Sequence, residues 1–212
     1  MTIRLTLLCA SPARTVLGCA PLSERAPHDV GAALTSPPAH SATLRSPSAG
    51  SALIAAGLGV RAAVDPALRD IDYGTWRGRT VADVVAADPC GYSSWLTDPD
   101  AAPHGGETAR QLCRRIAQWL SSLPADTGRT LAIVEAAVAQ AVLVHALSAP
   151  PRALWKLSVP PLNAVHLTCC DGVWRVQPTD VCPVQGVRRP PPVPLTPLTA
   201  PRHRFSDRGM FV

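Results

Sequence analysis

Two continuous apolar runs constrain what this chain can fold into. The first covers residues 3–9 and the second covers residues 130–134, and both are followed by small residues that suit a turn into a helix. Apolar residues that continue along a strand, rather than alternating with polar ones, are typical of strands buried on both faces of a parallel sheet. We therefore expect both runs to be inner strands of a sheet that helices cover on its two sides.

The other segments carry helical and hairpin patterns. Four helices are expected, at residues 52–58, 80–87, 108–123 and 136–147. A last pair of strands is expected at residues 164–168 and 173–176, joined by a turn that contains Asp171 and Gly172. Strands that alternate with helices predict an α/β fold, a three-layer sandwich with a mostly parallel central sheet flanked by helices. The 212 residues, 47% of them hydrophobic, allow one domain with a substantial core.

The C-terminal end has a different composition. We expect the domain to cover residues 1–179 and to be followed by a tail, residues 180–212, that is rich in proline and arginine. Proline fixes φ and removes an amide donor, so the tail is predicted to be disordered with polyproline II character. Two interpretations stay open for it, an untethered tail or a ligand for an SH3-like groove or an acidic partner.

Charge, cysteine spacing and hydropathy exclude several classes of protein. The net charge is +5, but basic residues outside the tail are dispersed, so nucleic acid is not expected as a partner. The seven cysteines show neither a Cys-x-x-Cys pair nor zinc-site spacing, and we expect no disulfide, no metal and no cofactor. The apolar run at residues 5–10 is too short for a signal peptide or a membrane span, which predicts a cytoplasmic protein without membrane contact.

Two motifs in the middle of the chain are the most diagnostic. Residues 68–80 contain an aromatic-Gly-x-Trp-x-Gly core that begins at Tyr73, and residues 103–108 read Pro-His-Gly-Gly-Glu-Thr. Both resemble segments of the histidine phosphatase (phosphoglycerate mutase-like) superfamily, and weaker similarity extends over about residues 3–178. The resemblance implies the same three-layer α/β sandwich that the apolar pattern predicts.

The resemblance also locates the positions that carry chemistry in active members of that superfamily. Those enzymes attack a phosphoryl group with the histidine of an Arg-His-Gly motif, bind its oxygens with two arginines and a second histidine, and protonate the leaving group with a carboxyl group. At the aligned positions this chain has Cys9 for the first arginine and Ala10 for the nucleophile. Gly50 occupies the position of the second arginine, and Glu135 occupies the position of the second histidine. Only the acid has an equivalent, Asp70, where the family usually has glutamate.

These substitutions predict a degenerate active site without confident catalytic residues. A methyl side chain cannot be phosphorylated, and a carboxylate about 4 Å from a phosphate charge adds a repulsion of about 4 kcal/mol at an effective dielectric constant of about 20. We therefore predict a pseudophosphatase with a binding or regulatory role. An unknown protein partner would reach it through the former cleft or through residues 180–212.

Two catalytic alternatives remain open. Cys9 and Arg14 form a loop one residue shorter than the Cys-x5-Arg loop of cysteine phosphatases, and a buried structural cysteine is the simpler interpretation of Cys9. Asp70 and Glu135 could instead form an acid–base pair, which would give a phosphomonoester hydrolase or mutase-like enzyme with residual or altered chemistry. Glu135 could equally cap the helix that begins at Ala136.

Several further residues receive structural interpretations. Glu107 is expected in the first turn of its helix, and His104 is expected on a surface loop rather than in the site. His145 and His166 are interpreted as structural histidines of a helix and a strand. The five tryptophans are expected to pack in the core or at its rim: Trp76, Trp95, Trp119, Trp155 and Trp174.

Overall fold

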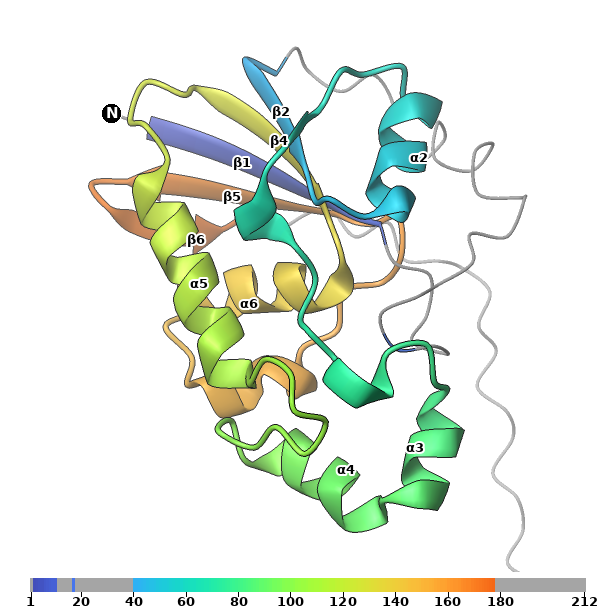
Figure 1. Cartoon of the computed structure of the whole chain (residues 1–212). Coiled ribbons are helices and arrows are strands. Elements are labelled where there is room, and N and C mark those ends of the chain that lie inside the picture. The colour runs from blue at the N-terminus through green and yellow to red at the C-terminus, as the bar shows by residue number, and fades with distance from the viewer. Residues whose placement is uncertain (1, 11–16, 18–39, 178–212) are drawn as a thin grey trace, which may run out of the picture. The chain divides into compact units, whose positions relative to one another are not determined.

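The structure is a computed structural model, and it describes residues 2–10, 17 and 40–177. The predicted tail at residues 180–212 and Arg14 lie outside the described residues. Six strands form one mixed sheet with the spatial order β3-β2-β4-β1-β5-β6 (Figure 1). The strands are β1 Thr2–Cys9, β2 Ala42–Arg45, β3 Ala63–Val64, β4 Arg129–Val134, β5 Ala164–Cys170 and β6 Val173–Val176.

The sheet combines a parallel part and an antiparallel part. β1 pairs in parallel with β4, and β4 with β2, so that Cys9 and Val134, the last residues of β1 and β4, lie side by side. β5 and β6 add an antiparallel hairpin on the other side of β1. Its turn places Asp171 and Gly172 at φ values of 53° and 78°, as a type I′ turn requires. The predicted α/β fold is confirmed.

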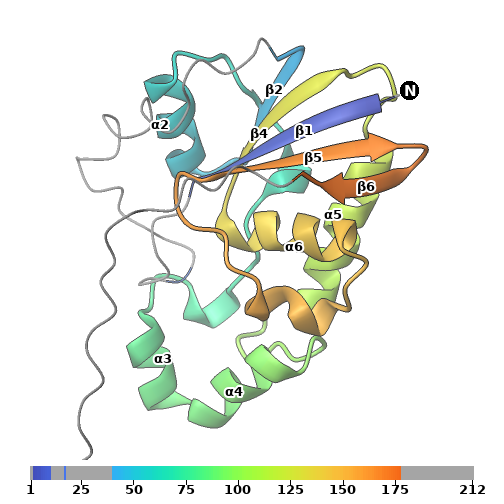
Figure 2. The same cartoon turned by 180° about the vertical axis from the view of Figure 1, so that it is seen from behind.

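Helices cover both faces of this sheet. The covering helices are α2 Ala49–Gly57, α5 Ala109–Ser122 and α6 Ala136–Ala146. Two further helices, α3 Val81–Ala87 and α4 Pro89–Thr97, lie away from the sheet, and short 3-10 turns form η1 Pro66–Leu68, η2 Gly74–Trp76 and η3 Pro151–Lys156. Successive residues of β1 serve different layers, because Leu7 packs in the cluster of α5 and α6 whereas Leu8 packs against Ile54 of α2. In Figures 1 and 2, α5 and α6 lie together beneath the sheet and α2 lies apart from them.

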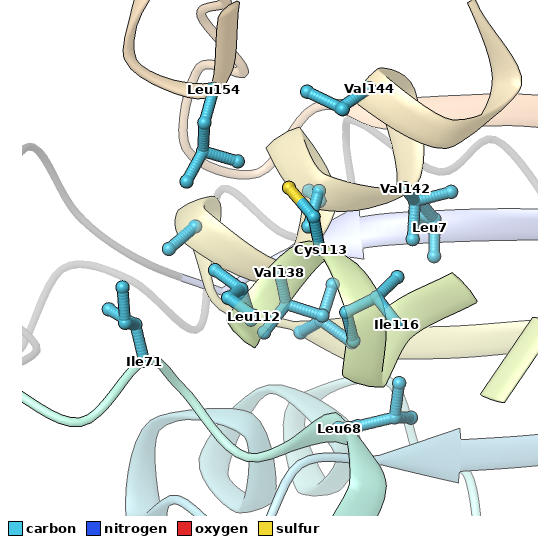
Figure 3. Close-up of a cluster of buried hydrophobic side chains, with 14 of the residues drawn as sticks. Leu7, Leu68, Ile71, Leu112, Cys113, Ile116, Val138, Val142, Val144 and Leu154 are labelled. Atoms are coloured by element: carbon cyan, nitrogen blue, oxygen red, sulfur yellow. The ribbon is translucent and has the colours of Figure 1, made fainter. Parts of the chain in front are cut away.

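The main hydrophobic core lies between the sheet and the pair α5 and α6. The amphipathic pattern of α5 is confirmed, since Leu112 and Ile116 are fully buried and face α6 residues that include Val138 and Val142 (Figure 3). Each buried large aliphatic side chain contributes about 1.5–3 kcal/mol to folding. α5 is the longest described helix, with 14 residues, and none of the described helices has the length and apolarity needed to cross a membrane.

Local chemistry explains where the observed helices differ from the expected ones. α2 begins at Ala49, three residues earlier than predicted, because the Ser48 side chain accepts a hydrogen bond from the Ser51 amide and caps it. α4 was not predicted, since Pro89 and Gly91 resemble a helix stop. Pro89 instead occupies the first turn, and the Asp88 side chain caps the helix from so close that a Cβ on residue 91 would lie 1.9 Å from its Oδ2.

Candidate functional site

Two of the positions to which the family resemblance points, Ala10 and Glu135, lie at one edge of the sheet together with Ser46. Ala10, Ser46 and Glu135 directly follow the carboxyl ends of the parallel strands β1, β2 and β4. Backbone hydrogen bonds tie these ends together, with 2.7 Å from the Ala10 amide to the Val134 carbonyl and 2.9 Å from the Ser46 amide to the Ile133 carbonyl. The carboxyl edge of parallel strands is where α/β proteins bind ligands, so we take this edge as the candidate site.

Glu135 is the buried charged group of this edge. Its side chain is held by serines of the loop before α2, because Oε1 accepts a hydrogen bond of 2.9 Å from the Ser46 hydroxyl and a second one from the Ser48 hydroxyl. Glu135 is 8% exposed, and its Oε2 is buried without a hydrogen-bond partner among the described residues. The carboxylate is therefore hydrogen-bonded inside the protein to a serine cluster formed by Ser46, Ser48 and Ser51, of which Ser46 and Ser48 donate to it directly.

The interpretation of Glu135 as a helix cap is corrected by these contacts. Glu135 occupies the N-cap position of α6, with φ −72° and ψ 161°, but its side chain makes no capping hydrogen bond. Ser48 links it to the other helix instead, since the Ser48 hydroxyl donates to Glu135 and accepts from the Ser51 amide at 3.0 Å. Ser48 thus connects the carboxylate to the N-terminus of α2, which is the positive end of that helix. Glu135 itself is the residue at which α6 starts.

Ala10 and Gly50 complete the set of substituted positions on this edge. Ala10 is 3% exposed and has only a methyl side chain. Gly50 lies in the first turn of α2, and a Cβ there would lie 3.7 Å from the Ser48 Oγ, which is an ordinary contact. The local backbone therefore has room for the first atom of a larger side chain at residue 50, and sterics near Cα do not require glycine.

Cys9 is enclosed at the end of β1. It is 1% exposed, and its Sγ lies 3.8 Å from the Val159 carbonyl oxygen. Both polar groups of the Cys9 backbone form hydrogen bonds: the amide donates to the Asn163 carbonyl at 3.1 Å, and the carbonyl accepts from the Leu162 amide at 2.9 Å. These contacts favour the interpretation of Cys9 as a buried structural cysteine.

Asp70 stands apart from the serine cluster in its hydrogen bonding. It is partly buried in the segment after η1, where its Oδ1 accepts a hydrogen bond of 2.8 Å from the Ile71 amide. Glu135 has its described hydrogen bonds with Ser46 and Ser48, so no hydrogen bond joins the two carboxyl groups within the described part of the chain.

A buried ion pair fixes the segment that leads to Asp70. The Nε and Nη2 groups of the Arg115 guanidinium donate hydrogen bonds to the Glu107 carboxylate, at 2.9 and 2.7 Å. The third nitrogen, Nη1, donates to the carbonyl oxygens of Ala67 and Arg69, at 2.6 and 2.9 Å. Glu107 precedes the N-cap residue Thr108 of α5, so its expected place in the first turn is wrong. Its function is to hold Arg115, which binds the chain just before Asp70.

The expectation of a surface loop for His104 is also wrong. His104 is 1% exposed, and its ring packs edge-on against Trp76 and Trp95 at centroid distances of 5.0 and 5.9 Å. Its Nδ1 accepts a hydrogen bond of 2.9 Å from the Gly106 amide, and its Nε2 is buried without a partner in the described residues. Trp76 belongs to the 68–80 motif and Trp95 lies outside it, so the burial depends on how these segments pack together.

Because of His104, the protein is expected to lose stability below neutral pH. Burial lowers the pKa of His104, although Asp72 opposes that shift. The unfolded chain therefore binds the proton first, so the loss begins below about pH 6.5 and continues until the lowered folded pKa is passed. In urea unfolding, we expect the natural chain to lose more stability than His104→Gln between about pH 7.5 and about pH 5.5. Burial also lowers the pKa of His40, but His40 is present in both proteins and contributes equally to both losses. Equal losses of stability in the two proteins would therefore contradict the assignment to His104.

A resident metal has no cluster of ligands in the described part of the chain. No group of three or more histidine, cysteine, aspartate or glutamate side chains there could hold a metal ion. The polar side chains gathered at the candidate site include the carboxylate of Glu135 and the hydroxyls of Ser46, Ser48 and Ser51, and the Arg45 guanidinium donates to the Ser46 carbonyl at 3.0 Å. The arrangement can accept and donate hydrogen bonds, but the four substituted positions supply neither an imidazole nor a guanidinium.

Comparisons with known proteins identify the family. A curated relative, the adenosylcobalamin/alpha-ribazole phosphatase of Salmonella typhimurium, is 27% identical over 123 residues, which are 57% of this chain and only 61% of that enzyme. A candidate alpha-ribazole-5'-P phosphatase from Escherichia coli superposes with a TM-score of 0.72 at 18% identity, over 82% of this chain and 94% of that chain. YhfR from Bacillus stearothermophilus gives 0.71 at 20% identity, over 82% and 95%, and both structures show the likeness of fold alone. The family model of the histidine phosphatase superfamily (branch 1) matches residues 35–180, and the chain therefore belongs to that superfamily.

Proposed function

We propose that this protein is a pseudophosphatase, which keeps the histidine phosphatase fold but does not hydrolyse phosphomonoesters through a phosphohistidine. The observation that carries the proposal is the buried carboxylate of Glu135, which two serine hydroxyls hold at the carboxyl edge of the sheet. It stands at the position of the family's second histidine. An internal anion therefore occupies the place where active relatives gather positive charge.

The chemistry of the neighbouring positions supports the same proposal. Ala10, at the position of the nucleophile, has no lone pair that could attack phosphorus. A phosphate dianion near Glu135 would meet a carboxylate whose Oε2 has no donor of its own among the described residues. Repulsion of this kind is strengthened in a buried site, because the effective dielectric constant there is low.

The competing function is a phosphomonoester hydrolase with altered chemistry that uses Asp70 and Glu135. The curated relative from Salmonella typhimurium is a phosphatase, and Arg115 holds the segment before Asp70 in a defined position. In such an enzyme Asp70 would protonate the leaving group and Glu135 would activate a water molecule. Turnover would then depend on both carboxyl groups.

An assay of the full chain with p-nitrophenyl phosphate between pH 4 and 9 separates these functions. We expect no hydrolysis above the protein-free rate, and no difference between the natural chain and the variants Asp70→Asn and Glu135→Gln. Hydrolysis that both substitutions abolish would overturn the pseudophosphatase proposal in favour of the altered enzyme. Hydrolysis that is equal in all three proteins would point to a contaminating phosphatase, which a further purification step would remove.

A binding or regulatory role then remains for the protein, which we place in the cytoplasm. The seven cysteines fit a reducing compartment, since their spacing suits neither a disulfide framework nor zinc. We propose a protein partner that is reached through the edge formed by Ala10, Ser46 and Glu135 or through residues 180–212. A version of the chain without residues 180–212 distinguishes the two routes in any binding assay with an identified partner.

A further inference from the structure

A second candidate site lies at the opposite end of α6 from Glu135. A pocket of about 490 Å³ opens between α5 and the turn that ends α6. The residues that line it include Arg110, Cys113, Arg114, Val144, His145 and Ser148. Ten residues of helix, or about 15 Å, separate Glu135 from His145. The pocket falls in the volume range of small-molecule sites, and it contains none of the positions aligned with the phosphatase chemistry.

The inner wall of the pocket is apolar. Cys113 of α5 and Val144 of α6 belong to the buried cluster of the main core, where Figure 3 labels both. Burial raises the pKa of the Cys113 thiol to about 11, so the sulfur is neutral at physiological pH and forms part of the apolar surface. A compact apolar group can therefore pack here.

The outer wall is basic. Arg114 is exposed and makes no ion pair within the described part of the chain. Arg110 pairs with Asp100 through Nε at 2.5 Å and Nη2 at 2.8 Å, which holds the guanidinium in place and leaves its Nη1 group to other acceptors. Asp100 and Asp98 are opposing charges near Arg110, and Asp100 also attracts Arg114 without forming an ion pair with it, so the guanidinium that remains free to pair with a ligand is that of Arg114.

Ser148 gives the pocket a hydroxyl at an unusual backbone position. Its φ of 50° lies in the left-handed region that favours glycine, and it occupies the residue after the helix end where glycine is usual. The Ser148 amide donates to the His145 carbonyl and the Ala149 amide to the Val144 carbonyl, which completes a Schellman turn. These bonds satisfy two carbonyls of the helix end and so reduce its negative character beside the pocket. A strained serine at a site that glycine would fill better points to a use for its hydroxyl.

We propose that this pocket binds a small organic oxyanion, a carboxylate or phosphate group on a compact apolar body. Arg114 and the outer nitrogen of Arg110 receive the anion, because guanidinium groups match the geometry of both kinds of oxyanion. The Ser148 hydroxyl and a ring N–H of His145 donate further hydrogen bonds, and the apolar body rests on Cys113 and Val144. The site is independent of the proposed loss of phosphatase chemistry.

Titration of the full chain, labelled with ¹⁵N, tests this site with three probes of one ring size. Benzoate and phenyl phosphate carry the two kinds of oxyanion, and benzyl alcohol carries no charge. We expect both anions to shift the amide signals of residues 110–117 and 144–151, and to bind at least about tenfold more tightly than benzyl alcohol. Comparison of the two anions shows which oxyanion the pocket prefers. Affinity for the alcohol equal to that for the anions would overturn the proposal.

Two variants, one of which is expected to stabilise the protein, sharpen the test. Arg114→Gln is expected to weaken benzoate binding at least about tenfold, since the charge-assisted bond is lost. Ser148→Gly is expected to weaken it several-fold while raising the melting temperature, because glycine relieves the left-handed strain. Unchanged affinity in Arg114→Gln would overturn the proposal. Benzoate cannot be a phosphatase substrate, and binding unchanged in Glu135→Gln keeps this result separate from any failure of the proposed function.

Discussion

Replacement of Gly74 by alanine is expected to lower the free energy of unfolding by about 3–5 kcal/mol. Gly74 has a φ of +46°, and a Cβ added there would lie 2.0 Å from the carbonyl oxygen of His104. The clash is with backbone, which cannot rotate away as a side chain can. The two segments are also held together by hydrogen bonds, from the Thr75 amide to the His104 carbonyl at 2.9 Å and from the Glu107 amide to the Asp72 carbonyl at 2.8 Å.

Gly78 is the matched control for Gly74. Its φ of +78° imposes a similar conformational penalty on alanine, but a Cβ there would meet nothing within 4 Å. We expect Gly78→Ala to cost about 1–2 kcal/mol, which is the strain of the left-handed backbone alone. Urea unfolding of both variants measures the difference between their losses of free energy. We attribute that difference to the close approach of the backbone at Gly74 to the backbone at His104. Equal losses at the two glycines would mean that the segments separate easily and that their packing is not specific.

Removal of Glu107 is the second change with a large expected effect. The side chains of Glu107 and Arg115 are 9% and 13% exposed, and the pair is bidentate. Glu107→Ala leaves the guanidinium of Arg115 buried with only backbone carbonyls to receive it, and such a loss costs about 3–5 kcal/mol. Glu107→Gln keeps the shape and one acceptor oxygen, so an intermediate loss is expected. Chemical denaturation of the three proteins gives the ranking.

The exposed ion pair of Arg110 and Asp100 is the control for Glu107. Its side chains are 44% and 59% exposed, so water and salt screen the attraction. Asp100→Asn should therefore change stability little, although the pair has the same bidentate form. A loss at Asp100 as large as that at Glu107 would show that the buried position of the Glu107 pair is not what makes it important. Because Arg115 also holds the chain before Asp70, Glu107→Ala should in addition broaden the amide signals of residues 67–71 in ¹⁵N spectra.

Glu135 places a buried carboxylate at the carboxyl edge of a histidine phosphatase fold. A histidine phosphatase needs unneutralised donors at the carboxyl edge of its sheet, and these donors favour an anion. In this chain the carboxylate of Glu135 supplies the anion itself, and Ser46 and Ser48 donate to it. Ser48 also caps α2, so the carboxylate is linked to the start of that helix. Under the pseudophosphatase proposal, the fold accommodates Glu135 through these two serine hydroxyls.

Local patterns in the sequence determined much of this protein. The continuous apolar runs that became β1 and β4, the stripe of α5 and the Asp171-Gly172 turn depend on neighbours within a few residues, so periodicity and turn chemistry predict them. The motif around Tyr73 pointed to the family, whose model matches residues 35–180.

Only the tertiary structure decided which distant groups meet. Ser46 and Glu135 are 89 residues apart and touch because β2 and β4 end at the same edge of the sheet. His104 is buried because the loop that carries it packs against Trp76 and Trp95, a contact that no local propensity encodes. Capping of α4 by Asp88 likewise outweighed the helix-stop signals around it. Propensity acts over a few residues, whereas the partner of a buried polar group depends on strand register and on what the core leaves unsatisfied.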